Sequence, residues 1–335
     1  MRLILHIGVW KTGSSAIQSF LNLNRAALRG QGILSPSFTT APNGRAALLR
    51  AALAKDTTTL NRLVHELWQE ADAANAHTLI LSCEHYWPSS REVLDMIASA
   101  LKPRCSSVEV VAYLRPQDEL WGAILAQQAK SLRVKPGRPL WGDNHFVGWG
   151  IARRGMFFAR CLRRFERVFD AKIAARHYNR STFPDRDVVR SFLELTGVPE
   201  DGLELSSGDA NLSLGWKGLA FSMSLAADRD QSSKWRRSML KRRLAATVRK
   251  MARRHDDPDW MGRAPVIFDG DERARIRAVY AEDEKRLADR FFDGVSPFPP
   301  PSDPVTSPFG PNTLDPAEMR EAERIFRSSL GIRKS

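Results

Sequence analysis

The chain has 335 residues, of which 43% are apolar and 27% charged, and 51 Lys and Arg outnumber 38 Asp and Glu for a net charge of +13. This composition supports a sizeable core and excludes wholesale disorder. No stretch approaches the roughly 18 to 20 consecutive apolar residues of a membrane-spanning helix, and the N-terminus runs straight into a strand-like segment, so we expect neither a signal peptide nor a span. Three widely spaced cysteines without a C-x-x-C pair favour a reducing cytoplasm over a disulfide framework or a zinc cluster.

Strands and helices are predicted to alternate over the first 205 residues. Apolar runs typical of strands cover 3–7, 78–82, 108–114 and 172–177. Helical periodicity covers 14–28, 60–74, 91–101, 117–132, 153–168 and 185–195. Gly197 suits the C-cap of the last of these helices. Such alternation predicts βαβ units and a parallel sheet covered by helices on both faces.

Strand signals stop after about residue 205. Helices are predicted after Asn211, over 234–254, over 271–290 and over 316–330. Residues 297–316 hold eight of the nineteen prolines and are expected to form an extended arm. We therefore divide the chain into an α/β domain (1–225), a basic helical extension packed on it (226–295), and a proline-rich arm with a terminal helix (296–335).

The positive charge is concentrated in the predicted helix 234–254. This segment has ten basic residues and no acidic one, and without it the net charge falls from +13 to +3. Its apolar residues lie on one side of the helix: Trp235, Met239, Leu244, Val248 and Met251. Such a helix could lie on an anionic membrane, contact a polyanionic acceptor, or pack its apolar side on the core. Nucleic acid is a weaker candidate, because no zinc-finger spacing or aromatic RNA-binding signature accompanies the charge.

The segment between the first strand and the first helix, residues 5–18, is suited to hold a phosphate. Gly8 and Gly13 allow a tight turn, so that the amides from Lys11 to Ser15 point at one spot at a helix N-terminus, where the helix dipole favours an anion. Lys11 adds a positive charge. Hydroxyl donors come from Thr12, Ser14 and Ser15.

This loop differs from the loop of nucleotide triphosphatases, G-x-x-x-x-G-K-[ST], in which the lysine follows the second glycine. Here Lys11 precedes Gly13 by two residues. The arrangement suits a mononucleotide 5′-phosphate that carries a transferable group and needs no metal.

The residues His6-Ile7-Gly8, Lys11-Thr12-Gly13-Ser14-Ser15 and Gln18 resemble the 5′-phosphosulfate loop of the sulfotransferase family that uses 3′-phosphoadenosine 5′-phosphosulfate (PAPS), in its bacterial, glycan-directed form. Stretches 79–85, 110–118 and 165–197 resemble further parts of that family in its order, so the resemblance covers about residues 1–225. It implies a three-layer α/β sandwich with a central parallel sheet, like that of P-loop NTPases. It also implies transfer of a sulfuryl group from PAPS, without a metal, to a hydroxyl or amine acceptor, here a glycan or polysaccharide.

The resemblance also implies which residues bind the nucleotide. Those of the loop are Gly8, Lys11, Thr12, Gly13, Ser14 and Ser15, with Lys11 also catalytic. Arg115 would hold the 3′-phosphate, and a guanidinium at the end of a parallel strand can indeed grip a phosphate with two hydrogen bonds. The family's serine eight residues later is Ala123 here, which predicts weaker or reorganised 3′-phosphate binding. Asn211 and Ser213 resemble, less closely, a late Asn-x-Ser element near the nucleotide, although Asn211 is equally suited to a helix N-cap.

Glu84 and His85 follow the predicted strand 78–82, and either side chain could take a proton from an acceptor hydroxyl. Because side chains alternate across a strand, we expect only one of them to face the sulfur. The resemblance favours Glu84. A carboxylate that caps a helix, or a packed imidazole, is the alternative interpretation of each residue.

Two other functions remain open. A kinase-like phosphotransferase would use the same loop for ATP with magnesium, and a module that binds polyanions or membranes would have lost activity, as Ala123 suggests. Tryptophans that could stack on sugar rings, or lie in the core, include Trp10, Trp87, Trp121, Trp141 and Trp149. We expect a cytoplasmic protein that contacts the inner face of the membrane, if at all, through residues 234–254.

Overall fold

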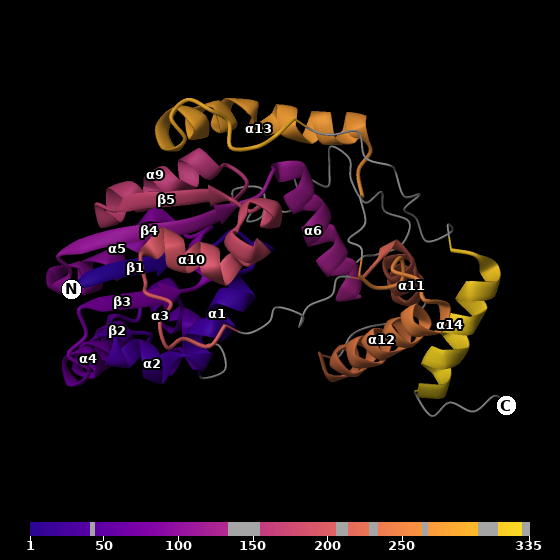
Figure 1. Cartoon of the computed structure of the whole chain (residues 1–335), viewed down its shortest axis with the longest axis horizontal. Helices are drawn as coiled ribbons and strands as arrows, with labels where there is room; N and C mark the ends of the chain where they lie inside the picture. Colours follow the sequence, from indigo (N-terminus) through magenta and orange to yellow (C-terminus); the bar gives the residue numbers. More distant parts are fainter. Residues whose placement is uncertain are drawn as a thin grey trace. The chain divides into compact units, whose positions relative to one another are not determined.

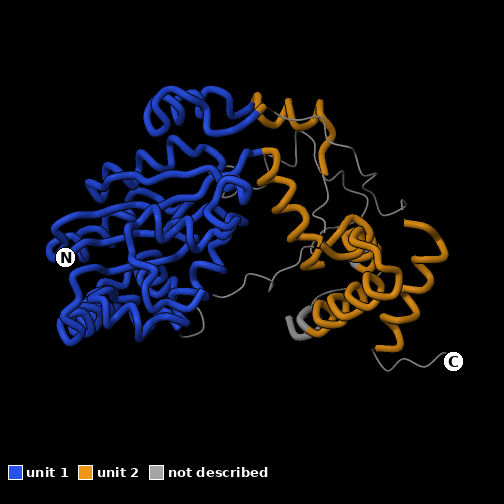
Figure 2. Tube along the Cα trace, viewed as in Figure 1, with its two compact units in different colours: residues 1–117, 147–208, 279–299 blue, residues 118–146, 209–278, 300–335 orange. Residues whose placement is uncertain are grey.

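The computed structural model describes residues 1–40, 44–132, 155–205, 214–227, 234–262, 267–300 and 314–329. The chain divides into two compact units, each assembled from three segments (Figure 2). Unit 1 comprises residues 1–117, 147–208 and 279–299, and unit 2 comprises residues 118–146, 209–278 and 300–335. The domain divisions after residues 225 and 295 stay predictions.

Unit 1 is built on a five-stranded parallel sheet with the strand order β2-β3-β1-β4-β5 (Figure 1). Its strands are β1 (Arg2–His6), β2 (Ile33–Leu34), β3 (Thr78–Ser82), β4 (Ser107–Leu114) and β5 (Lys172–His177). Ile4 of the central strand pairs with Ile80 on one side and with Glu109 on the other. Because every pairing is parallel, the carboxyl ends of all five strands meet at one edge of the sheet. The predicted α/β class with a parallel central sheet is confirmed.

Helices of unit 1 pack on both faces of this sheet. On one face lie α1 (Ser14–Leu23), α2 (Arg25–Gly30) and α10 (Val188–Thr196), whose buried side chains form one core cluster with Ile4, Ile80 and Val111. Alternate strand residues such as Leu3 and Leu79 are buried toward the other face. The helices packed against one another there are α3 (Ala47–Leu53), α4 (Thr57–Ala73), α5 (Arg91–Leu101) and α9 (Phe158–Phe169). Of these, α9 contacts β4 and β5 directly.

Short 3-10 helices complete unit 1: η1 (Ser37–Thr40), η2 (Gly44–Ala46), η3 (Glu84–Tyr86), η4 (Lys102–Arg104), η5 (Arg180–Thr182) and η6 (Pro184–Arg186). The N-terminus of α9 is held by a distant carboxylate. Asp283 accepts hydrogen bonds from the backbone N–H groups of Ala159 (2.9 Å) and Arg160 (3.2 Å). Asp283 therefore acts as the cap that the sequence of α9 itself does not supply.

Unit 2 is helical in its described part. It contains most of α6 (Gln117–Lys130), α11 (Trp216–Ala227), α12 (Lys234–His255), the start of α13 (Gly270–Phe291), and α14 (Pro316–Ser329). Its core includes Phe221, Trp260 and Phe326. A fully buried carboxylate, Asp118, pairs with both Arg273 (2.5 Å) and Arg277 (2.7 Å). None of the helices in the described ranges is long and apolar enough to cross a membrane.

The basic helix α12 packs its apolar side on the core, which is the third of the arrangements considered above. Leu244, Val248 and Met251 are buried in the core of unit 2 together with residues of α11 and α14. Basic side chains remain exposed at Arg242, Arg243, Arg249, Lys250, Arg253 and Arg254. Since the apolar residues are already covered by protein, these three cannot also insert into a bilayer. Contact of the exposed charges with a polyanion or an anionic surface stays a prediction.

Candidate functional site

The loop between β1 and α1 contains two residues in the left-handed backbone region, Lys11 (φ 65°) and Gly13 (φ 81°). This conformation suits Gly13 but costs a residue with a side chain about 1–2 kcal/mol. Backbone strain of this kind gathers at functional sites, where the surrounding structure maintains it. The buried Thr12 hydroxyl donates a hydrogen bond to the Val9 carbonyl (2.5 Å), so in this structure it shapes the loop.

The N-terminus of α1 follows this loop. Its N-cap residue is Gly13, so no side chain caps the first turn, and this turn has no acidic residue. The first N–H groups of a helix have no partner within the helix, and the dipole there is positive. Lys11 and Ser15 are exposed beside this helix end, whereas Ser14 is buried. The structure thus has a helix N-terminus at the place where the sequence predicts an anion, and anion binding there stays a prediction.

Gly8 lies where no side chain would fit. A Cβ atom on Gly8 would lie 2.6 Å from Ser14 Oγ and 3.1 Å from His6 Nε2. Both of these atoms are buried, and neither has a hydrogen-bond partner among the described residues. Leaving a buried polar atom unpaired costs about 1–3 kcal/mol. An oxygen atom of an anion bound beside Gly8 would supply such a partner.

His6 is held as a neutral imidazole behind the loop. Its Nδ1 atom lies 2.7 Å from Ser82 Oγ, and its ring packs edge-on against Tyr113 and Phe192. Burial, opposed by the charge of Glu84, lowers the pKa of His6 to about 4. At neutral pH His6 is therefore a polar, uncharged support for β1 and β3.

Glu84 lies at the carboxyl end of the strand next to β1, where α1 fixes its position. The side chain of Gln18 donates a hydrogen bond to Glu84 Oε2 (2.8 Å) and approaches the Ser82 carbonyl (3.5 Å). Gln18 and Ser14 are one helical turn apart on α1, and both are buried. One helix thus connects the loop with the candidate base.

The expectation that only one of Glu84 and His85 faces the site assumed that both lie in a strand, and this assumption was wrong. Both residues belong to the 3-10 helix η3, which follows β3 directly, so strand alternation does not apply to them. Both line the same cavity, Glu84 half-buried and His85 exposed. Of the two, Glu84 accepts a hydrogen bond from Gln18, and which of them acts as the base stays a prediction.

Arg115 follows β4 and lies against Tyr178, which follows β5. The guanidinium carbon is 5.1 Å from the centre of the Tyr178 ring, a cation–π distance. The Tyr178 N–H donates to the Leu114 carbonyl (2.6 Å), which fixes the backbone of this residue at the end of the sheet. The same ring would lie 3.0 Å from a Cβ atom on Gly13. Tyr178 therefore lies next to both Arg115 and the loop.

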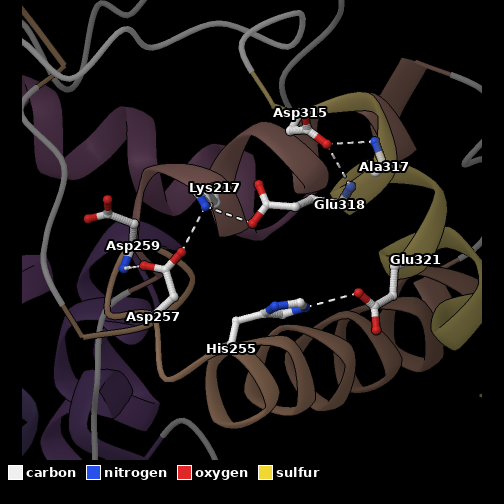
Figure 3. A network of polar contacts seen from close by, with 8 residues as sticks. All are labelled: Lys217, His255, Asp257, Asp259, Asp315, Ala317, Glu318 and Glu321. Atoms are coloured by element: carbon white, nitrogen blue, oxygen red, sulfur yellow. Dashed lines mark hydrogen bonds and ion pairs between the residues drawn. The ribbon is translucent and has the colours of Figure 1, made fainter.

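Three of the residues considered in the sequence, Asn211, Ser213 and Ala123, belong to unit 2, as does the neighbouring Lys217. Asn211 and Ser213 lie outside the described residues. Ala123 lies on α6 in unit 2, and its effect on 3′-phosphate binding stays a prediction. Lys217, which follows the Asn-x-Ser element, pairs with Asp257 (2.8 Å) and Glu318 (2.7 Å), as Figure 3 shows. In unit 2 this lysine thus connects α11 to α14. Burial alone would lower the pKa of Lys217, but its two carboxylate partners outweigh this effect and raise the pKa.

A cavity of about 1020 Å³ opens beside Glu84 within unit 1. We call it the arginine-lined cavity, because its wall includes Arg45, Arg50, Arg91, Arg160 and Arg164. Glu84 is the one carboxylate among the described residues of that wall, and Trp10 and Gln18 border it on the side of the loop. Ligand sites commonly measure about 300–1,000 Å³, so this cavity is large enough for a substrate.

Sequence reasoning missed several residues that the structure brings together. Gln18 was only part of a motif, and Tyr178 only part of a resembling stretch. The five arginines are scattered over four elements, and only the spacing of Arg160 and Arg164, one helical turn apart, could have linked any of them. Of the tryptophans, Trp10 lines the cavity, Trp87 and Trp121 are buried, and Trp141 and Trp149 lie outside the described residues.

Across the described ranges, no group of three or more His, Cys, Asp and Glu side chains is placed to hold a metal ion. The chain matched no model of a protein family, and comparisons with curated proteins and with solved structures gave no match either. The function must therefore be argued from the geometry of the loop, Glu84 and the cavity.

Proposed function

We propose that this protein is a sulfotransferase that moves a sulfuryl group from PAPS to a hydroxyl or amine of a glycan. The observation that carries the proposal is the junction of β1 and α1. There, Gly8 adjoins two buried polar atoms that have no hydrogen-bond partner within the described part of the chain, and α1 holds the carboxylate of Glu84 at the edge of a large cavity. A P-loop-type fold belongs to the proposal, and the central position of β1 in a parallel sheet supports it.

The donor nucleotide would bind through the loop and the end of β4. The amides at the N-terminus of α1, the hydroxyls of Ser14 and Ser15, and the ammonium of Lys11 would hold the 5′-phosphosulfate. Arg115, supported by Tyr178, would hold the 3′-phosphate with the fork of its guanidinium. Asn211 and Ser213 are further proposed contacts of the nucleotide.

The transfer requires a base on the acceptor side and positive charge on the donor side. Glu84 would take the proton from the acceptor hydroxyl while the oxygen of that hydroxyl attacks sulfur in line. An oxygen–sulfur bond forms, the bond from sulfur to the 5′-phosphate oxygen breaks, and adenosine 3′,5′-bisphosphate leaves. Lys11 and the loop amides would stabilise the charge that grows on the departing oxygen. Gln18 keeps Glu84 in position, and His85 is the second candidate for the base.

A comparison of two nucleotides tests the proposal. A ligand that binds only the native state at one hundred times its Kd adds about 2.7 kcal/mol to the free energy of unfolding. We expect adenosine 3′,5′-bisphosphate to raise the melting temperature more than ATP with magnesium does, and Arg115→Gln to reduce that rise. A larger rise with ATP and magnesium would favour a kinase-like phosphotransferase. No rise with either nucleotide would favour a binding module that has lost activity.

A further inference from the structure

We propose that the arginine-lined cavity is the acceptor site and that it selects an acidic carbohydrate, one that already carries carboxylate or sulfate groups. The inference rests on the proposed function of the neighbouring loop and adds the charge class of the acceptor. The inference follows from three features of the cavity: the elements that supply its arginines, its charge balance, and its volume and lining.

The arginines of the cavity come from four different elements. Arg160 and Arg164 are one turn apart on α9, whereas Arg45 and Arg50 come from η2 and α3. Arg164 donates a hydrogen bond to the Ser89 carbonyl in the cavity wall, which holds this side chain in place. The cap that Asp283 provides fixes the first turn of α9, from which Arg160 extends. The fold thus holds the side chain of Arg164 and the backbone from which Arg160 extends.

The charge balance of the wall is strongly positive. Five guanidinium groups face one carboxylate among the described lining residues, and that carboxylate is the proposed base, Glu84. Arg91 also pairs with Asp95 (3.4 Å), which lies outside the wall. A cleft lined by one sign of charge attracts ligands of the opposite sign. Arginine forks match carboxylate and sulfate groups with two hydrogen bonds, which a neutral acceptor cannot offer in the same charge-assisted form.

The volume and the lining of the cavity favour an anionic carbohydrate over other anions. At about 1020 Å³ the cavity can hold more than a single small group. Trp10 is half-buried at its border next to the loop, where an aromatic face can pack against a sugar ring. An acceptor that stacks on Trp10 lies beside both Glu84 and the proposed donor site. An acidic peptide is the competing ligand, and the experiment includes it.

Calorimetric binding to defined hexasaccharides tests the inference. The probes are hexasaccharides of hyaluronan, heparin and polygalacturonate, each paired with a form in which the acidic groups are removed, and an acidic tyrosine-containing peptide. We expect at least one acidic hexasaccharide to bind at least ten-fold more tightly than its neutral form. Arg50→Gln combined with Arg160→Gln should weaken that binding at least ten-fold.

The matched control is Arg29→Gln combined with Arg62→Gln, which removes the same charge from exposed positions of unit 1 outside the cavity. This variant should bind the hexasaccharide like the wild type. The inference is overturned if none of the three acidic hexasaccharides binds at millimolar concentration, if neutral forms bind equally well, if the control weakens binding as much, or if only the peptide binds. Adenosine 3′,5′-bisphosphate binding, measured on the same samples, reports separately on the proposed donor site, so the two failures are distinguishable.

Discussion

Lys11 occupies a backbone conformation that suits glycine better than lysine. Its φ of 65° costs about 1–2 kcal/mol, and glycine at this position would avoid most of that cost. The lysine is exposed, so packing in a core does not account for it. The strain is understandable if the ammonium group is needed at the mouth of the loop, where the proposed departing phosphate gains charge.

Replacing Lys11 by glycine and by alanine separates strain from chemistry. Both variants lose the ammonium group, so we expect turnover of labelled PAPS with an acceptor to fall on the order of 100-fold or more in each. Lys11→Gly should also be about 0.5–1 kcal/mol more stable than Lys11→Ala, because relief of the left-handed strain exceeds the entropy that glycine adds to the unfolded chain. Urea denaturation measures this difference. Unchanged turnover in Lys11→Ala would show that the proposed charge stabilisation is wrong.

At the scale of elements, the site depends on how α1 and η3 meet. α1 starts at the loop and presents Gln18 one turn later, and η3 starts where β3 ends. The hydrogen bond of Gln18 to Glu84 therefore connects the ends of two neighbouring strands. His85 belongs to the same 3-10 helix but is more exposed, and no contact of the loop holds it among those described.

This arrangement predicts unequal effects at the two candidate bases. Glu84→Gln keeps the shape of the side chain but cannot take a proton, so we expect kcat for sulfuryl transfer to fall about 100-fold or more. His85→Ala should lower kcat by less than about ten-fold, since the residue only borders the cavity. Thermal shifts with adenosine 3′,5′-bisphosphate should match the wild type in both variants. If both variants keep the wild-type kcat, η3 does not supply the base.

The sequence predicts elements well where a pattern is long and poorly where contacts are distant. The four predicted strands appear as β1, β3, β4 and β5, with ends that differ by one residue at most. β2 has two residues, too few for a periodic signal. The predicted helix 14–28 breaks at Asn24, whose side chain bonds to the Phe20 carbonyl and to the backbone of Glu204, far away in the sequence. The five arginines of the cavity meet only because the sheet and its helices bring four elements together.

For the whole molecule, the net charge conceals two separate basic regions. Residues 234–254 account for most of the excess of +13, which suggested that the rest of the surface is ordinary. Yet unit 1 gathers five arginines around one cavity, and a net charge summed over the chain does not show such clustering in space. A local field, and not the overall charge, therefore determines which acceptor the proposed site favours.

Acid should weaken unit 1 through His6, because its pKa of about 4 in the folded chain lies below the ordinary value of 6.5. Between these pH values the unfolded chain binds a proton and the native state does not, so stability present above pH 6.5 is lost as the pH falls toward 4. The full loss is about 3 kcal/mol, and about 2 kcal/mol of it falls between pH 7 and pH 5.

Two other buried or paired groups also change stability with pH. Burial raises the pKa of Asp283, which acts in the opposite direction to His6. The lowered pKa of Asp257, in unit 2, matters only below pH 3.8.

A His6→Asn variant isolates this contribution, because asparagine keeps a polar group near Ser82 but does not titrate. Native-state hydrogen exchange of the β1 and β4 amides reports the stability of unit 1 separately from that of unit 2. Between pH 7 and pH 5 we expect the wild type to lose about 2 kcal/mol more than the variant, whatever the lower starting stability of the variant. Parallel losses would mean that the pKa of His6 is the same in the native and the unfolded chain, so that the imidazole beside Gly8 becomes charged between pH 7 and pH 5.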